Sequence, residues 1–447
     1  MTAPLNLRRT YEANVRHGMA RGRDGVVASA LEGNIDDVCR LISRKTRKGT
    51  YSFTSYRQLL MSKGAHRNPR ILSIPAARDR IVLKSLAFLI QEIFPETKGK
   101  VAQQKVAELR KSLEKNSFDA FIRLDVQNFY PSVSHEAIMR AVRRKVRKPE
   151  ILSLIQGAIE TPTLPDSAPR LDGQATRGVP QGLPVSNLLA EVAMLRIDNQ
   201  FCGVATMKYI RYVDDIIILC ASGDTEAICR EVTAACAAIA LTVHEPRPTG
   251  SKSKIGLIAH SFDYLGYVFA PNRITVRAES VSKLKSSIAR VFTRYKYETA
   301  GMPPGDPSRA KALSECQWKL NLVITGCIFD NQRRGWLHYF SQITDVSILK
   351  SLDATVQNFA RRFGLPPDFQ PKTFTRTYWS ITSGDDGDDP YVPNFNNYTP
   401  EQKRRVLIEV FGMDQAEAFK DDAVDRVFRK EVKRLVDKLE RDFSGLS

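Results

Sequence analysis

The sequence predicts a fold of the α+β class, in which short strands and helices are mixed within one part of the chain. Alternating apolar residues at 121–127 are typical of a strand, and two further apolar strands are expected at 207–212 and 216–220. Apolar residues at helical spacing predict helices at 187–200 and 225–240. Because strands and helices are interleaved, a purely helical bundle and a purely stranded barrel are both excluded.

Four regions of different character follow one another along the chain. Residues 1–117 are basic and mostly helical, 118–270 carry the mixed strands and helices, 271–365 are helical, and 366–447 combine an acidic loop with a charged helix. A chain of 447 residues is long enough for two or three compact units rather than one small core.

A strongly basic helix is expected just after the first strand of the mixed region. The pattern predicts a helix from Ser134 to Lys148, which Pro149 then ends because proline cannot continue a helix. Its last turns carry a run of arginines and lysines. Such a run is either a solvated helix face or a contact for backbone phosphates.

The charge of the whole chain points to a polyanionic partner. Lysine and arginine number 67 against 49 acidic residues, a formal charge of +18 with a pI near 9.6. Basic side chains that neutralise phosphates release condensed counterions, which favours binding of nucleic acid. The alternative is a soluble surface that happens to be rich in lysine and arginine.

Cysteine spacing and hydropathy exclude several other classes of protein. The seven cysteines form no CxxC pair and no zinc pattern, so free thiols in a reducing cytosol are expected. The amino terminus lacks the apolar core of a secretory signal, and the apolar stretch 216–221 is far too short to cross a bilayer. We therefore expect a soluble, cytoplasmic protein with no membrane partner.

Three carboxylates stand where predicted strands end. Asp125 closes the strand at 121–127, and Asp214 and Asp215 occupy the turn between the next two strands. Adjacent acids beside buried strands repel each other, and bound divalent cations would remove that cost. A pair of Mg²⁺ ions held by such converging acids catalyses nucleotidyl transfer. The alternative is an ordinary hairpin turn, where aspartate is common.

Four sequence blocks, in this order, resemble those of reverse transcriptases. They are FIRLDVQNFYPSV (121–133), GVPQGLPVSNLLAEV (178–192), YIRYVDDIIIL (209–219) and FDYLGYVF (262–269). The resemblance covers about residues 40–270, and more weakly the region beyond.

This resemblance implies a right-hand polymerase fold with fingers, a palm that carries an antiparallel sheet and the YxDD hairpin, and a helical thumb. The expected domains are 1–117 for the N-terminal region and fingers, 118–270 for the palm with part of the fingers, 271–365 for the thumb, and 366–447 for a mostly helical C-terminal extension. The implied activity is RNA-directed DNA polymerisation with dNTPs.

The resemblance also implies the residues of a metal centre. Asp125 and Asp214 correspond to the principal ligands of two Mg²⁺ ions, and Asp215 corresponds to the third acid of the hairpin. The backbone carbonyl of Val126 would complete a metal shell.

Nucleotide-binding residues carry over in the same way. Tyr130 corresponds to the aromatic residue under the sugar, where a ring leaves no room for a 2′-hydroxyl; the alternative is a core aromatic. Gln181 resembles the glutamine that contacts the incoming nucleotide, and Gly182 lets the loop approach it closely. Lys63 and Arg70 resemble the fingers residues that grip the triphosphate, although both could belong to a solvated basic face.

Two further groups complete the implied site. The family's primer grip corresponds to Tyr264, Leu265, Gly266 and Tyr267. Either Lys252 or Lys254 could be the basic residue that protonates pyrophosphate, and the sequence does not choose between them.

The C-terminal part narrows the type of reverse transcriptase. No ribonuclease H acids and no zinc-binding endonuclease tail follow the thumb, whereas the segments 319–327, 335–343 and 391–395 are similar to those of bacterial defence-associated reverse transcriptases, above all the first subunit of type 3 systems. The resemblance implies a non-coding RNA template, a DNA product and a second reverse transcriptase subunit or an oligomer. The alternatives are a retron-like or other retroelement enzyme, an RNA polymerase of similar fold, and a catalytically silent subunit that binds nucleic acid.

Overall fold

The computed structural model divides the chain into two compact units. Unit 1 comprises Met1–Lys100 and Ser112–Leu257, and unit 2 comprises Val101–Lys111 and Ile258–Ser447. The residues that the structure describes are 1–62, 68–99, 101–168, 173–247, 249–303, 305–383 and 390–441.

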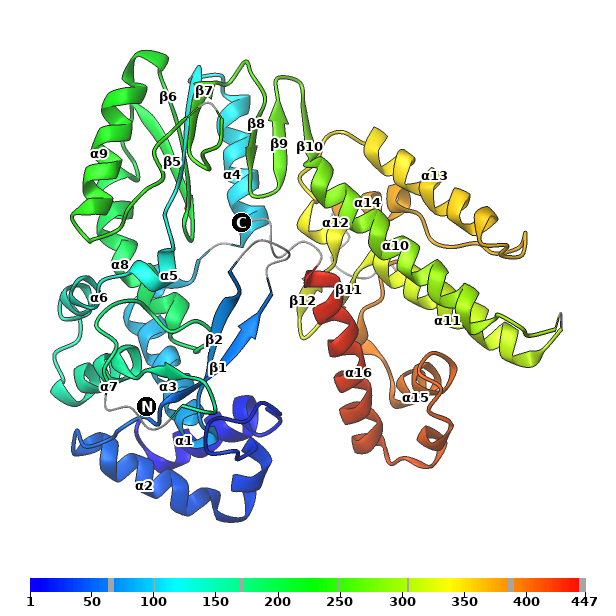
Figure 1. The fold of residues 1–447 in the computed structure, drawn as a ribbon, viewed down its shortest axis with the longest axis horizontal. Coiled ribbons are helices and arrows are strands. Elements are labelled where there is room, and N and C mark those ends of the chain that lie inside the picture. The colour runs from blue at the N-terminus through cyan, green and yellow to red at the C-terminus, as the bar shows by residue number, and fades with distance from the viewer. Residues whose placement is uncertain are drawn as a thin grey trace. The chain divides into compact units, whose positions relative to one another are not determined.

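Unit 1 contains a four-stranded antiparallel sheet in the order β5-β6-β3-β7 (Figure 1). The strands are β3 (Ala120–Asp125), β5 (Met207–Tyr212), β6 (Asp215–Cys220) and β7 (Lys254–Leu257). All residues of β3 and β6 are buried, because these two strands are central in the sheet. Their register places Asp125 opposite Asp215, so the first and last of the predicted acids meet across one strand pair.

A second sheet of unit 1 joins distant segments. It has the order β2-β1-β4, from strands β1 (Tyr56–Met61), β2 (Arg70–Ile74) and β4 (Thr163–Leu164). The hairpin β1–β2 exposes the large apolar side chains of Leu59, Leu60 and Ile71.

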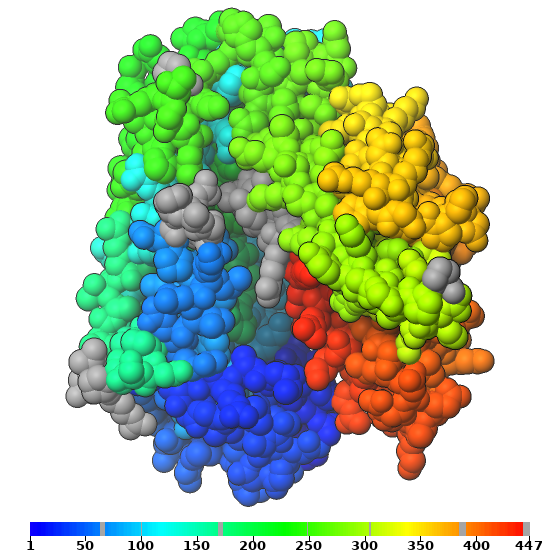
Figure 2. Space-filling model, turned by 45° about the vertical axis from the view of Figure 1, so that its right-hand side comes forward, coloured from blue at the N-terminus to red at the C-terminus, as the bar shows by residue number. Residues whose placement is uncertain are grey.

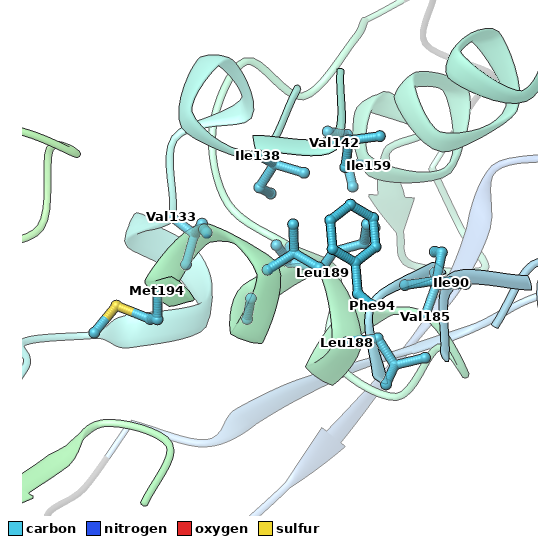
Figure 3. Packing of buried hydrophobic residues seen from close by; sticks show 14 of the residues in the cluster. Ile90, Phe94, Val133, Ile138, Val142, Ile159, Val185, Leu188, Leu189 and Met194 are labelled. Carbon is cyan, nitrogen blue, oxygen red and sulfur yellow. The ribbon is translucent and has the colours of Figure 1, made fainter. Parts of the chain in front are cut away.

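Unit 1 contains several helices, of which α3, α6 and α9 contact α8. The helices are α1 (Pro4–Thr10), α2 (Ile35–Arg47), α3 (Ala77–Ile93), α5 (Phe129–Ser132), α6 (His135–Val142), α7 (Pro149–Glu160), α8 (Ser186–Phe201) and α9 (Thr225–Ala237). Figure 3 shows Leu189 of α8 surrounded by Ile138 and Val142 of α6 and by Phe94, which follows α3. These side chains are almost completely buried, so α8 is anchored firmly in the core of the unit.

Unit 2 is mostly helical, with two small antiparallel sheets. The strands are β8 (Phe262–Tyr264), β9 (Tyr267–Ala270) and β10 (Arg273–Val276), followed by the hairpin β11 (Cys327–Phe329) and β12 (Gln332–Arg334). The helices are α10 (Ala278–Glu298), α11 (Pro307–Thr325), α12 (Trp336–Tyr339), α13 (Ser347–Arg362), α14 (Phe374–Thr382), α15 (Pro400–Glu409) and α16 (Asp421–Arg441). Helices α15 and α16 pack against each other and share a cluster of buried apolar side chains; Figure 2 shows their orange and red surfaces side by side.

The connecting helix α4 (Ala102–Glu114) contributes residues to both units. In the described part of the chain, no helix combines the length and the apolar character needed to cross a membrane.

The α+β class predicted from the sequence is confirmed by this arrangement of sheets and helices. The helix predicted from Ser134 to Lys148 is wrong in its second half. Helix α6 ends at Val142, and Pro149 begins α7 instead of ending the preceding helix. Proline suits the first turn of a helix because its missing N–H would have no intrahelical partner there.

Candidate active site

The three predicted acids lie at one end of the central sheet of unit 1. Asp125 is the last residue of β3 and Asp215 is the first residue of β6, while Val213 and Asp214 form the two-residue turn between β5 and β6. Val126, which follows Asp125, donates its N–H to the carbonyl oxygen of Asp214 at 3.1 Å. The end of β3 is therefore bonded directly to the hairpin turn.

Val213 has an unusual backbone conformation. Its φ is +56°, a left-handed value that a β-branched side chain rarely adopts. A two-residue hairpin turn with positive φ at its first central residue normally has glycine, asparagine or aspartate there. Strain of this kind persists only where the surrounding structure enforces it, and it is common at functional sites.

The carboxylate of Asp125 faces two basic side chains. Its Oδ2 atom lies 3.3 Å from Nζ of Lys252 and 3.3 Å from Nε2 of His244. The backbone of Asp125 is held on both sides, because its N–H donates to Oγ of Ser253 at 3.0 Å and its carbonyl accepts from the N–H of His244 at 3.0 Å. The backbone of Asp125 is thus fixed, and its carboxylate lies beside the side chains of Lys252 and His244.

Asp214 lies close enough to Asp125 and Asp215 for their negative charges to raise the pKa of its carboxyl. Burial raises the pKa of its carboxyl to about 6, the negative charges of Asp125 and Asp215 add to the rise, and Lys252 opposes it. This is the behaviour expected of a carboxylate crowded by like charges in a partly buried place. A bound cation would reverse it.

Asp215 has a different environment from the other two acids. Its Oδ1 accepts from Nε of Arg123 at 3.0 Å and its Oδ2 accepts from Nη2 at 3.3 Å, and both side chains are almost completely buried. Among the described residues, no three His, Cys, Asp or Glu side chains are grouped closely enough to hold a metal ion. The role of Asp215 as a third metal ligand therefore stays a prediction, and in this structure its carboxylate neutralises an arginine.

The loop that carries Gln181 is bonded to two separate parts of unit 1. The N–H of Val179 donates to the carbonyl of Tyr130 at 2.8 Å, and the carbonyl of Gln181 accepts from the N–H of Ser73 in β2 at 2.6 Å. Gly182 has φ +100°, and a Cβ atom there would lie 3.2 Å from the carbonyl oxygen of Ser73. Glycine is therefore needed at this position for the loop to approach β2.

Tyr130 lies among charged residues of the site. Its hydroxyl donates to Oδ1 of Asn187 in α8 at 2.8 Å. Burial raises the pKa of Tyr130 to about 12, the negative charges of Glu191 and Asp214 add to the rise, and the positive charge of Arg70 opposes it. Tyr130, Asp214 and Arg70 are therefore neighbours, although they are distant in the sequence.

Of the two residues expected to bind the triphosphate, Arg70 lies within the described part of the chain and Lys63 does not. Arg70 begins β2 and its side chain is exposed.

The structure separates the two candidate lysines. Lys252 reaches Asp125, as described above, whereas Lys254 begins β7 and stands opposite Arg123 in the register of the sheet. Lys252 is thus placed against Asp125, the first carboxylate that the sequence assigned to catalysis.

The predicted primer-grip residues belong to unit 2, where they form the end of β8, the turn and the start of β9. Leu265 and Gly266 have φ values of +47° and +83°. Tyr264, Leu265 and Tyr267 are completely buried, and the hydroxyl of Tyr339 donates to the carbonyl of Leu265 at 3.2 Å. Their side chains build the core of unit 2, and their grip on a primer stays a prediction.

Sequence reasoning missed several residues that contact the acids, above all Arg123 and His244. Arg123 could have been found, because residues two apart on a strand share a face and Asp215 stands on the neighbouring strand. His244 carries no comparable local signal. It reaches Asp125 only because residues 242–244 run beside the end of β3.

Comparisons with known proteins agree with the geometry. Residues 61–269 match the family model described as reverse transcriptase (RNA-dependent DNA polymerase). Protein YkfC of Escherichia coli (strain K12) is 24% identical over 190 residues, which are 40% of this chain and 49% of that protein. The chain thus spans about half the length of this curated relative.

Solved structures show a more distant likeness. Telomerase from Candida albicans, in complex with a TWJ fragment of telomeric RNA, is 11% identical with a TM-score of 0.43 over 85% of this chain and 65% of that one. Apo telomerase from Candida tropicalis is 11% identical with a TM-score of 0.39 over 88% and 68% of the chains. A partial Cas6-RT-Cas1–Cas2 complex is 18% identical with a TM-score of 0.29 over 53% and 41%.

The matched family segment contains all the elements that build the site. It runs from the end of β1 through β3, the loop of Gln181 and the β5–β6 hairpin to β9. Proteins of this family are generally metal-dependent. All four sequence blocks lie within residues 61–269, the segment that matches the reverse transcriptase family.

Proposed function

We propose that this chain is an RNA-directed DNA polymerase that adds dNTPs to a primer end, with Asp125 and Asp214 at its reaction centre. One observation carries the proposal. Two carboxylates from distant parts of the sequence meet at the end of one sheet, inside a segment that matches the reverse transcriptase family. The raised pKa of Asp214 supports the proposal. A turn with a purely structural role would gain nothing from a carboxylate held partly buried beside other negative charges.

The side chains present fit a pair of Mg²⁺ ions in their chemistry. Asp125 and Asp214 would offer carboxylate oxygens and Val126 a backbone carbonyl, which are the hard ligands that Mg²⁺ prefers. Bound Mg²⁺ would activate the 3′-hydroxyl of the primer and neutralise the triphosphate. Asp215 would share its carboxylate between Arg123 and a cation if it became a further ligand.

Lys252 is the residue we assign to the leaving group. The reaction forms a bond between the primer 3′-oxygen and the α-phosphorus and breaks the bond from that phosphorus to pyrophosphate. The ammonium of Lys252 contacts Asp125, and the side chain is 68% exposed, so it would turn toward pyrophosphate and give it a proton.

Tyr130 is the residue we assign to sugar selection. Its ring is fixed through the hydroxyl by Asn187 and lies within reach of the charge of Asp214. A ring held in that way beside the reaction centre would clash with a 2′-hydroxyl, which favours dNTPs.

The proposed partners are an RNA template and a DNA product, with a bacterial antiphage role that uses a non-coding RNA and a second reverse transcriptase subunit or an oligomer. The formal charge of +18 supports a nucleic-acid partner, and the C-terminal segments resembling defence-associated enzymes support the role. A retron-like retroelement enzyme is the alternative of the same class.

A second candidate function follows from Arg123. Because Asp215 is already neutralised and no group of three metal-binding side chains exists among the described residues, the chain could bind nucleic acid as a polymerase-fold subunit without catalysis. The two candidates differ in one measurement, which is Mg²⁺-dependent incorporation of dNTPs.

The deciding experiment is primer extension on an RNA template with the purified full chain. The polymerase hypothesis predicts incorporation that requires Mg²⁺ and is lost in Asp214→Asn. Asp119→Asn is the matched control, because Asp119 lies just before β3 and only caps the N–H of Ser222. Template binding without any incorporation would support the silent subunit instead.

A further inference from the structure

The turn that presents Asp214 is held from behind by a buried arginine. Arg211 is 7% exposed and lies on β5, two residues before the strained Val213. Its Nη1 atom donates to the carbonyl oxygen of Val213 at 2.9 Å. This hydrogen bond fixes the peptide that joins Val213 to Asp214.

All five N–H groups of Arg211 have acceptors. Nε and Nη2 donate to the two carboxylate oxygens of Asp198 at 2.8 and 2.5 Å, and Nη2 and Nη1 donate to those of Glu191 at 2.7 and 3.2 Å. A guanidinium has five donors in a fixed planar fork. Two bidentate pairs therefore use four of them and leave one N–H, which is directed at Val213.

Both acids come from α8, the helix that is anchored in the core of unit 1. Glu191 and Asp198 are seven residues apart, about two helical turns, and so lie on the same face of α8. The same helix also carries Asn187, the partner of Tyr130. One rigid helix thus sets the positions of the hairpin turn and of the tyrosine beside it.

We propose that Arg211 is a positioning residue, which transmits the rigidity of α8 to Asp214 by holding Val213 in its left-handed conformation. The inference rests on the proposed function, since it assigns Asp214 to the reaction centre. Without the fifth hydrogen bond, Val213 would relax toward negative φ and turn the following peptide. Lysine cannot replace arginine here, because its single nitrogen cannot form two bidentate pairs and a fifth contact.

A double-mutant cycle with Arg211→Lys and Val213→Gly tests this inference by primer extension. Arg211→Lys should lower kcat about 10- to 100-fold, with the KM for dNTP changed less than about threefold, because a small displacement of a reacting group costs that much. Val213→Gly removes the need for restraint, because glycine accepts positive φ without strain. In the Val213→Gly background, Arg211→Lys should therefore cost less than about threefold in kcat.

A role in folding alone would give a different result. Arg80→Lys is the matched control, because Arg80 also binds backbone carbonyls of unit 1, those of Pro75 and Ala20, and does not touch the hairpin. It should lower the melting temperature without lowering kcat. If Arg211→Lys costs the same factor in kcat in both Val213 backgrounds, the inference is overturned.

Equilibrium binding of Mn²⁺, followed by electron paramagnetic resonance, adds a readout that does not depend on turnover. Arg211→Lys should weaken Mn²⁺ binding, and Val213→Gly should restore it. Unchanged Mn²⁺ binding in Arg211→Lys, together with unchanged kcat, would also overturn the inference. If the wild-type chain binds Mn²⁺ but extends no primer, the proposed function fails, and the Mn²⁺ cycle alone decides the inference.

Glu191→Gln serves if Arg211→Lys does not fold. The amide keeps the size of the side chain but replaces one acceptor of the fork with a donor, which loosens Arg211 without leaving a buried cavity. Its loss in kcat should be smaller than that of Arg211→Lys and should also disappear in the Val213→Gly background. An equal loss in both backgrounds would contradict the inference.

Discussion

Two of the hairpin turns that contain left-handed residues, β11–β12 and β5–β6, adopt this conformation for different reasons. In unit 2, the β11–β12 turn consists of Asp330 and Asn331, with φ values of +51° and +56°. Aspartate and asparagine tolerate this conformation, and the turn matches the right-handed twist of its strands. In unit 1, the β5–β6 turn places Val213 at +56°, although a β-branched residue is poorly suited to it.

The comparison shows which turn conformation follows from the residues of the turn and which one needs contacts from distant residues. The β11–β12 turn follows from its own two residues, whereas the β5–β6 turn needs Arg211 and helix α8 to hold it. A turn that satisfies local rules is stable by itself. The β5–β6 turn, which does not follow these local rules, is maintained by contacts from distant residues. This is expected where the position of a side chain, here Asp214, matters more than stability.

The largest expected effect is on catalysis at the strained turn. Asp214→Asn should lower kcat of primer extension on the order of 10⁴-fold, because losing one ligand of the metal centre removes several kcal/mol of transition-state stabilisation. The unfolding free energy should not fall, since the substitution removes a crowded negative charge. Asp330→Asn in the other turn is the control and should extend primers normally; similar losses in both variants would refute the distinction between the turns.

Removing Asp215 should mainly affect stability. Asp215→Asn leaves the charge of Arg123 buried without its carboxylate, which should cost about 3–5 kcal/mol of unfolding free energy in chemical denaturation. Replacing both partners, with Arg123→Met added, should recover part of this loss. A stable Asp215→Asn variant that no longer binds Mn²⁺ would instead identify Asp215 as a metal ligand.

The raised pKa of Asp214 predicts a pH dependence of the metal-free protein. The carboxyl has a pKa of about 6 in the folded state against an ordinary value of 3.8, so the folded state binds a proton more tightly between these values. Stability should therefore fall as pH rises from 4 to about 6, by about 2–3 kcal/mol at most. Denaturant unfolding in a chelator should show this slope in the wild type and a flatter one in Asp214→Asn; parallel curves would argue against the crowding of these acids.

Sugar selection should respond to the ring of Tyr130. Tyr130→Val should raise kcat/KM for rNTPs about 10- to 100-fold relative to dNTPs, because removing the ring opens space for a 2′-hydroxyl. Competition between rNTP and dNTP in primer extension measures this ratio. Tyr130→Phe keeps the ring and loses only the bond to Asn187, so it should still exclude rNTPs.

The smallest expected effects are changes in unfolding free energy caused by glycine substitutions in the two turns. Val213→Gly should raise the unfolding free energy by about 1 kcal/mol, because it removes the cost of a left-handed valine. Asn331→Gly should change it by less than about 0.5 kcal/mol, since asparagine already tolerates that conformation. A destabilised Val213→Gly would show that the valine side chain contributes packing that outweighs its strain.

Much of this protein was predictable from local patterns. The strand that ends at Asp125, the strands around Asp214 and the helix that became α8 all follow from apolar spacing and turn residues, which act over a few neighbours in the chain. The prediction of one helix from Ser134 to Lys148 was wrong, because Pro149 begins the next helix and does not end the preceding one.

The amino-acid sequence by itself determined the α+β class, the order of the elements and the presence of acids at strand ends, because periodicity and turn chemistry are local properties. Only the tertiary structure decided that Arg123 neutralises Asp215, that Lys252 rather than Lys254 meets Asp125, and that Arg211 restrains Val213. Charges on separate strands and helices find their partners only once the core brings those elements together, and no spacing along the chain records which of several cations will lie nearest.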